Sequence, residues 1–182
     1  MDVTGHLESH GISYMVIGGF ANLKWGRPRL TEDVDLKVEV PESTWPSFVE
    51  GLAPRFTLLP PDPLAFLRQM HVIPILTPAG VRADLVVASL PYEHAAIGRA
   101  VTIPIGNRPV RICTAEDLIL HKIISERPRD RDDVEGVIIR QSSSLDRGYL
   151  DPKVQELAAG LERPEIADYY RTCLKKAVRI ET

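Results

Sequence analysis

The order of apolar and polar residues predicts strands mixed with helices up to about residue 113 and helices alone after it. Short apolar runs that end at Gly or Pro indicate buried strands. Residues 33–40 alternate polar and apolar side chains, which is typical of a half-buried strand. Turn-forming residues separate two pairs of these runs, and each pair is a predicted hairpin. The predicted strands are residues 14–17, 33–40, 55–59, 71–77, 81–88, 101–105 and 110–113.

Capping signals place the predicted helices. Thr114, followed by Glu116 and Asp117, combines a hydroxyl cap with an acidic first turn. We expect Asp130 to cap the next helix, and Asp151-Pro152 to begin another, because Pro suits the first helical position. Further helices are expected over residues 3–10, 20–25, 43–52, 63–69, 92–99 and 164–178. The fold class is therefore α/β (α+β), with a core in residues 1–113 and a helical part in residues 114–182 that shares this core.

Composition narrows the class of protein. The 182 residues are 44% hydrophobic and 26% charged, as in soluble globular proteins. Two distant cysteines, Cys113 and Cys173, form no disulfide framework. We find no signal peptide and no apolar run of membrane-spanning length, so we expect a cytoplasmic protein with no membrane partner. The net charge is −3, and the basic residues form no stripe of the kind that a protein needs to bind duplex DNA.

The candidate chemistry is concentrated in residues 18–36. Asp33 and Asp35 are two positions apart on a predicted strand, so both carboxylates lie on one face. Paired carboxylates suit Mg²⁺, which commonly takes one or two of them together with substrate phosphates. Gly18 and Gly19 follow a strand and open a helix, where backbone N–H groups favour an anion. The simpler alternatives are an acidic surface strand and an ordinary turn.

Asp84 is a third candidate. It lies in an otherwise apolar predicted strand, where a carboxylate is costly unless it is paired or binds a metal. The alternative to a metal-binding role is a salt bridge to a neighbouring arginine such as Arg82.

The combination is more specific than its parts. Their order along the chain resembles the nucleotidyltransferase superfamily with the DNA polymerase β-like fold. That order is a strand, Gly18-Gly19, a short helix, Arg29, Thr31, Asp33 and Asp35, and then a lone Asp on a later strand. Within this superfamily, the chain resembles the minimal and AbiEii-like nucleotidyltransferases, which include toxins of type IV toxin–antitoxin systems. The resemblance covers about residues 12–138. The usual superfamily signature has Gly-Ser where this chain has Gly18-Gly19.

The resemblance implies a catalytic site. Asp33 and Asp35 would hold Mg²⁺ on the triphosphate of an NTP, and Asp84 would complete a second metal site and would serve as general base. Gly18 and Gly19 would bind phosphates through their backbone. Arg29 would bind phosphate or pair with Glu32, and Thr31 would contact a phosphate oxygen or only begin the strand.

A second cluster follows in the helical part. The resemblance implies that Lys122 reaches the triphosphate as a point charge and that Asp130 orients it. The alternative is an ordinary exposed lysine. We expect Asp130 and Asp133 to be capping and solvated acids.

The sequence therefore predicts a Mg²⁺-dependent transferase that moves a nucleoside monophosphate from an NTP to a hydroxyl. The resemblance to toxin-like members suggests RNA or tRNA as the acceptor, and such an acceptor would imply an antitoxin partner. Lys24, Arg27, Arg29 and Lys37 near the motif favour this acceptor. The first alternative is an enzyme that modifies an aminoglycoside-type antibiotic. The second is a nucleotide- or metal-binding protein without turnover.

Overall fold

The structure, a computed structural model, describes residues 3–181 and divides into two compact units. Unit 1 comprises the described residues up to Phe20 together with residues 30–113. Unit 2 comprises residues 21–29 and the described residues from Thr114 onward. Helix α2 (Gly18–Trp25) begins in unit 1 and ends in unit 2.

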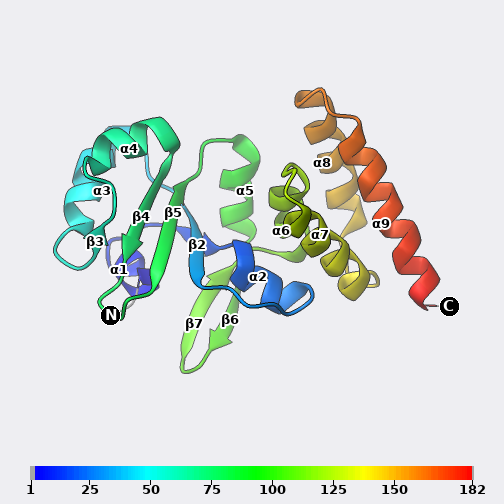
Figure 1. Ribbon diagram of the computed structural model, residues 1–182, viewed down its shortest axis with the longest axis horizontal. Helices are drawn as coiled ribbons and strands as arrows, with labels where there is room; N and C mark the ends of the chain where they lie inside the picture. Colours follow the sequence, from blue (N-terminus) through cyan, green and yellow to red (C-terminus); the bar gives the residue numbers. More distant parts are fainter. Residues whose placement is uncertain (1–2, 182) are drawn as a thin grey trace. The chain divides into compact units, whose positions relative to one another are not determined.

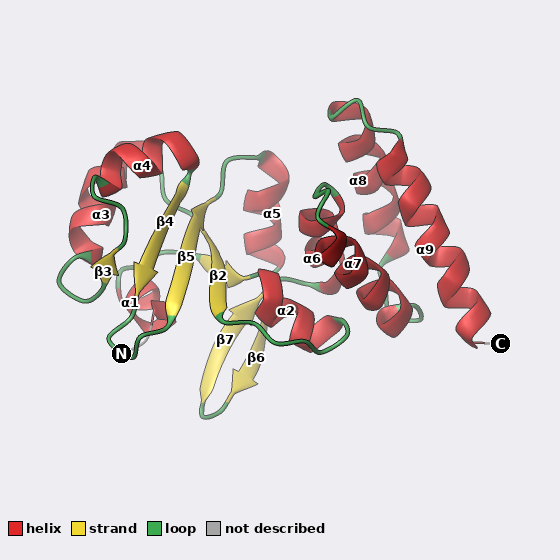
Figure 2. Ribbon diagram, viewed as in Figure 1, coloured by secondary structure: helices red, strands yellow, loops and turns green. Residues whose placement is uncertain are grey.

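Unit 1 is built on a mixed sheet, for which the described residues supply seven strands in the order β3-β4-β5-β2-β1-β7-β6 (Figure 1). Strand β2 runs antiparallel to β1 and parallel to β5. The hairpin of β6 and β7 extends beyond the other strands (Figure 2). The strands are β1 (Tyr14–Val16), β2 (Asp33–Val38), β3 (Thr57–Leu58), β4 (Val72–Leu76), β5 (Arg82–Val87), β6 (Val101–Ile105) and β7 (Arg108–Ile112).

The central strands carry the core of unit 1. Leu36, Val38, Leu85 and Ile73 are almost completely buried, and their branched side chains pack well on a pleated sheet. The polar residues of β2 occupy the alternate positions, as the sequence pattern predicted. The helices of this unit are α1 (Val3–Ser9), the 3₁₀ turn η1 (Glu42–Thr44), α3 (Trp45–Leu52), α4 (Pro63–Met70) and α5 (Pro91–Arg99), together with the first turn of α2.

An ion pair is buried beside this core. Lys37 of β2 donates to Glu93 Oε1 at 2.5 Å, and both side chains are less than a tenth exposed. The other oxygen of Glu93 accepts from the backbone N–H groups of Ser89 and Leu90 at the start of α5. These hydrogen bonds and Lys37 keep the pKa of Glu93 below its usual value, although burial alone would raise it.

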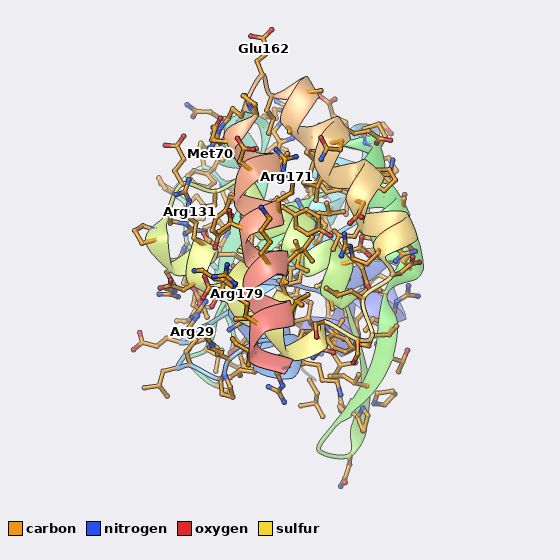
Figure 3. The ribbon with its side chains drawn as sticks, turned by 90° about the vertical axis from the view of Figure 1, so that its right-hand side faces the viewer. Arg29, Met70, Arg131, Glu162, Arg171 and Arg179 are labelled. Atoms are coloured by element: carbon orange, nitrogen blue, oxygen red, sulfur yellow. The ribbon has the colours of Figure 1, made fainter. Side chains whose placement is uncertain are left out.

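Unit 2 is helical. It contains α6 (Ala115–Ile123), α7 (Pro128–Gln141), α8 (Arg147–Gly160) and α9 (Glu165–Glu181). Thr114 caps α6 as predicted, since its hydroxyl accepts from Asp117 N–H at 3.1 Å. Figure 3 shows Arg171 and Arg179 along α9; both are exposed, whereas Cys173 and Ala177 of the same helix are buried.

Two predicted helix starts are wrong. Helix α7 begins at Pro128, because Pro at the first position sets the start, so Asp130 lies in the first turn and is not the cap. Helix α8 begins at Arg147, where the Asp146 side chain accepts from Tyr149 N–H at 3.0 Å. Pro152 therefore lies inside α8 and does not begin it.

Residues 21–29 form hydrogen bonds with helix α7 of unit 2. Arg140 donates to Gly26 O at 2.6 Å, and Gln141 donates to Trp25 O at 2.9 Å. A Cβ on Gly26 would lie 3.0 Å from a methyl carbon of Val137 and 2.1 Å from the Asn22 amide oxygen. Because of this close packing, residues 21–29 belong to unit 2, although its other helices follow them by about a hundred residues in the sequence.

None of the helices within residues 3–181 is both long enough and apolar enough to cross a membrane.

Candidate active site

The three predicted carboxylates lie on adjacent strands of unit 1. Asp33 and Asp35 alternate with Val34 and Leu36 on β2, so they point to the same face of the sheet. In the parallel register of β2 and β5, Asp35 lies beside Asp84 and Asp33 lies beside Arg82. All three carboxylates are half-buried. The structure thus places Asp33, Asp35 and Asp84 on one face of two neighbouring strands.

The start of helix α2 lies against this face. Gly18 has a φ of +62°, and a Cβ on it would stand 1.8 Å from Asp35 Oδ2. A Cβ on Gly19 would stand 2.3 Å from Thr31 Oγ1, and that hydroxyl lies 3.2 Å from Asp33 Oδ1, to which it donates. Only glycine allows the backbone of α2 to approach strand β2 and its carboxylates so closely. Gly18, Gly19 and Thr31 are therefore part of the same group as the carboxylates.

We expect Gly18→Ala to destabilise the protein. The methyl group would overlap the Asp35 carboxylate, and alanine is disfavoured at positive φ, so the cost should exceed about 1 kcal/mol. Gly51→Ala is the matched control, because Gly51 lies in α3 and a Cβ there would contact nothing within 4 Å. Urea unfolding should show a lower free energy of unfolding for Gly18→Ala and an equal or higher one for Gly51→Ala. Equal stability of Gly18→Ala and wild type would contradict the close approach.

Arg82 forms the salt bridge to Asp84 that the sequence offered as the alternative to a metal-binding role. Its Nε donates to Asp84 Oδ1 at 3.0 Å, and its terminal nitrogen donates to Oδ2 at 3.1 Å. The hydrogen bonds to Asp84 raise the pKa of Arg82, and the charges of Asp33 and Asp35 add to the effect. Both oxygens of the third carboxylate are thus engaged by one guanidinium.

The donor set fits Mg²⁺ and phosphate in its chemistry. Carboxylate oxygens on one face are suitable ligands for Mg²⁺, and the backbone at Gly18 and Gly19 can approach a phosphate closely. Within residues 3–181, no three or more His, Cys, Asp or Glu side chains are arranged so that they could hold a metal ion together. The metal assignment of Asp33, Asp35 and Asp84 accordingly stays a prediction.

An apolar pocket of about 530 Å³ lies on the opposite face of β2. Val34 and Leu36 line it, and these residues alternate with the two carboxylates. Thr77, Val81 and Ile105 form other parts of its wall. The pocket is therefore separate from the carboxylate face.

Lys122 belongs to a buried charge network in unit 2. Its ammonium lies 2.6 Å from Asp130 Oδ1 and 2.8 Å from Asp133 Oδ2, and its side chain is 8% exposed. The alternative of an ordinary exposed lysine is therefore wrong. Asp130 and Asp133 are also buried and ion-paired, so the expectation that they are solvated acids is wrong. Asp130 lies in the first turn of α7 and Asp133 in the second, and both pair with Lys122 in the last turn of α6.

Two arginines complete the network. Arg29 donates to both oxygens of Asp133, at 2.9 and 2.8 Å. Arg127 donates to Asp130 Oδ2 at 2.7 Å, and Ser125 donates to the same oxygen. The expectation that Arg29 binds phosphate or pairs with Glu32 did not include Asp133. Ser125 and Arg127 were not among the predicted site residues, although their spacing before Asp130 is visible in the sequence.

Burial and hydrogen bonding oppose each other at these acids. Burial alone would raise the pKa of both. For Asp130, hydrogen bonds from Lys122 and Ser125 outweigh it, and the pKa is lowered. For Asp133, hydrogen bonds from Arg29 and Lys122 do the same. Both groups are therefore ionised at neutral pH, and Lys122 is held between two negative charges.

Known proteins resemble this chain in structure. Neither the sequence profile of a protein family nor a curated protein matches it. An antigenic nucleotidyltransferase-like protein from Paracoccidioides brasiliensis superposes with a TM-score of 0.52 at 18% identity, over 93% of this chain and 88% of that one. The chain shares the fold of this nucleotidyltransferase-like protein. The antibiotic-resistance factor ANT(2'')-Ia gives a TM-score of 0.50 at 18% identity, over 92% of this chain and 91% of that one. The predicted α/β (α+β) fold class is confirmed.

Proposed function

We propose that the chain is a Mg²⁺-dependent nucleotidyltransferase that moves a nucleoside monophosphate from an NTP to a hydroxyl group. The observation that supports this most strongly is the face shared by Asp33, Asp35 and Asp84 directly beside Gly18 and Gly19. Three carboxylates on one face repel one another, and Arg82 balances only one of the three charges, so a cation at this face would be stabilising. The likeness in fold to nucleotidyltransferases is independent support.

The residues of unit 1 supply the parts that such a reaction needs. Asp33 and Asp35, with Asp84, would hold Mg²⁺ against the triphosphate. The bound metal would stabilise negative charge on the phosphates and the leaving pyrophosphate. Backbone N–H groups at the start of α2 would orient the phosphates. As the acceptor oxygen bonds to the α-phosphorus and the bond to the bridging oxygen breaks, an Asp84 carboxylate oxygen would take the hydroxyl proton.

The structure weakens the argument for an RNA acceptor. Of the four basic residues near the motif that favoured RNA, Arg29 is paired with Asp133 and Lys37 is buried against Glu93. Their charges are neutralised locally and add little attraction for a polyanion. A small molecule with a hydroxyl is accordingly the acceptor class we favour, and the resistance factor ANT(2'')-Ia has the same fold. An RNA acceptor and an antitoxin partner are the second candidate.

We expect Mg²⁺ with an NTP to raise the melting temperature. Binding to the folded state at 100 times the Kd adds about 2.7 kcal/mol, which is roughly 5–10 °C for a chain of this size. Mg²⁺ alone should do less, because phosphate oxygens complete its ligand shell. Thermal unfolding with each of the four NTPs, with and without Mg²⁺, measures this. An equal shift with Mg²⁺ alone, or none with any NTP, would count against the proposal.

The acceptor is found by incubating the protein with labelled NTPs and two kinds of acceptor. One set holds aminoglycosides and other hydroxyl-bearing small molecules, and the other holds total RNA and tRNA. Label transfer to a small molecule supports the favoured acceptor, and transfer to RNA supports the second candidate. Asp35→Asn is the control for both sets.

A further inference from the structure

Arg82 occupies a special place on the carboxylate face. It is the first residue of β5 and lies beside Asp33 in the register, two positions before Asp84. Its side chain therefore points to the same face as the three carboxylates. It is the residue that engages both oxygens of Asp84, in the two-point geometry that arginine makes with a carboxylate.

The charges make this contact more than a local salt bridge. Asp33, Asp35 and Asp84 together carry three negative charges when ionised, and Arg82 reduces the total to two. A single divalent cation balances two charges, whereas two such cations exceed even three. Arg82 thus already supplies half of the positive charge that a second divalent ion would bring to Asp84.

The contact is also easy to open. The Arg82 side chain is 54% exposed, whereas that of Asp84 is 20% exposed. The two-point geometry strengthens the pair, but water around the arginine screens its charge, and the long side chain has freedom to swing into water. A cation with a stronger preference for carboxylate oxygens can therefore replace the guanidinium without disturbing the strands.

We propose that Arg82 is a displaceable counter-ion that competes with the second metal ion for Asp84. The inference rests on the proposed function, because it assumes that the carboxylate face binds divalent metal. Arg82 neutralises Asp84 as long as no second ion is bound. The first ion is taken up by Asp33 and Asp35, and the second binds only as Arg82 leaves. Arg82 is thus a positioning residue that sets how readily the second ion binds.

Titration with Mn²⁺ tests this, because electron paramagnetic resonance counts the free ion directly. The samples are wild type, Arg82→Gln, Arg82→Lys and the control Arg68→Gln, each with a non-hydrolysable NTP analogue. Arg68 is an exposed arginine of α4, so its variant removes the same charge elsewhere in unit 1. Thermal unfolding in EDTA confirms that each variant folds.

We expect wild type to bind Mn²⁺ in a tight and a weak class. In Arg82→Gln the weak class should tighten by about tenfold, since both a competing ion pair and a repelling charge are gone. The tight class should change much less, Arg82→Lys should lie between, and Arg68→Gln should resemble wild type. The rise in melting temperature caused by Mn²⁺ should also be larger in Arg82→Gln.

An unchanged or weaker second class in Arg82→Gln, while wild type binds Mn²⁺, would overturn the inference and leave the proposed function standing. Equal tightening in Arg68→Gln would overturn it as well, because the effect would then be general charge. Absence of Mn²⁺ binding by every sample would overturn both the inference and the metal site of the proposed function.

Discussion

Asp35→Asn should lower nucleotide transfer by about 10²–10⁴-fold while the protein stays folded. A metal ligand that stabilises transition-state charge is worth several kcal/mol, and each 1.36 kcal/mol corresponds to a factor of ten in rate. The substitution changes no volume, and the Asp35 backbone oxygen keeps its hydrogen bond from Ile17 N–H at 2.9 Å. Removing one of the neighbouring charges also reduces repulsion, so stability in EDTA should stay level or rise.

The matched control is Asp62→Asn. Asp62 is exposed and caps α4 by accepting from Ala65 N–H at 3.0 Å, and asparagine caps as well as aspartate. Transfer by Asp62→Asn should match wild type. Two results would contradict the site: normal transfer by Asp35→Asn, or its unfolding without metal, which would show that Asp35 serves the fold.

Lys122→Met should destabilise the protein by about 3–5 kcal/mol at neutral pH. Methionine fills a similar volume, but it leaves Asp130 and Asp133 buried with less compensation, and breaking a buried pair from one side has this cost. Urea unfolding measures the change. Lys153→Met is the control, because the Lys153–Glu156 pair is exposed and should contribute less than about 1 kcal/mol.

The cost of Lys122→Met should shrink on acidification. In wild type the lowered pKa values of Asp130 and Asp133 give stability that is present above their unfolded pKa and is lost as pH falls through the folded pKa. In the variant, burial raises these pKa values, so the acids take up protons earlier and the penalty is relieved. A constant difference between pH 7 and pH 4 would contradict the network. A role of Lys122 at the triphosphate stays a prediction that only folded variants can test.

The sequence predicted the strands of unit 1 well because their pattern is local. Alternation in residues 33–38 placed both carboxylates on one face, and the apolar run around Asp84 placed it on a strand. That β2 and β5 are neighbours, which brings Asp84 beside Asp35, is a long-range pairing that periodicity cannot show. The prediction that Asp84 forms one site with Asp33 and Asp35 therefore depended on the resemblance to a family.

The helical part was harder to predict because its polar residues serve contacts distant in sequence. Asp133 looks like a solvated acid in its own helix, yet it pairs with Arg29, 104 residues earlier. Asp130 has the composition of a cap, but Pro128 sets the helix start and turns Asp130 toward Lys122. The helix propensity of a short segment contains no information on a partner distant in sequence. It also does not decide between two competing helix-start signals.

The membership of residues 21–29 in unit 2 affects how the chain is made. On a ribosome this segment emerges before its partners, because Asp133, Arg140 and Gln141 follow the residues that they contact by 104, 114 and 116 positions. At 5–20 residues per second the wait is roughly 5–20 s, far longer than a helix needs to form. During that interval Trp25 and Arg29 lack their final neighbours, and a nascent chain arrested before residue 133 should expose them to a chaperone or a protease.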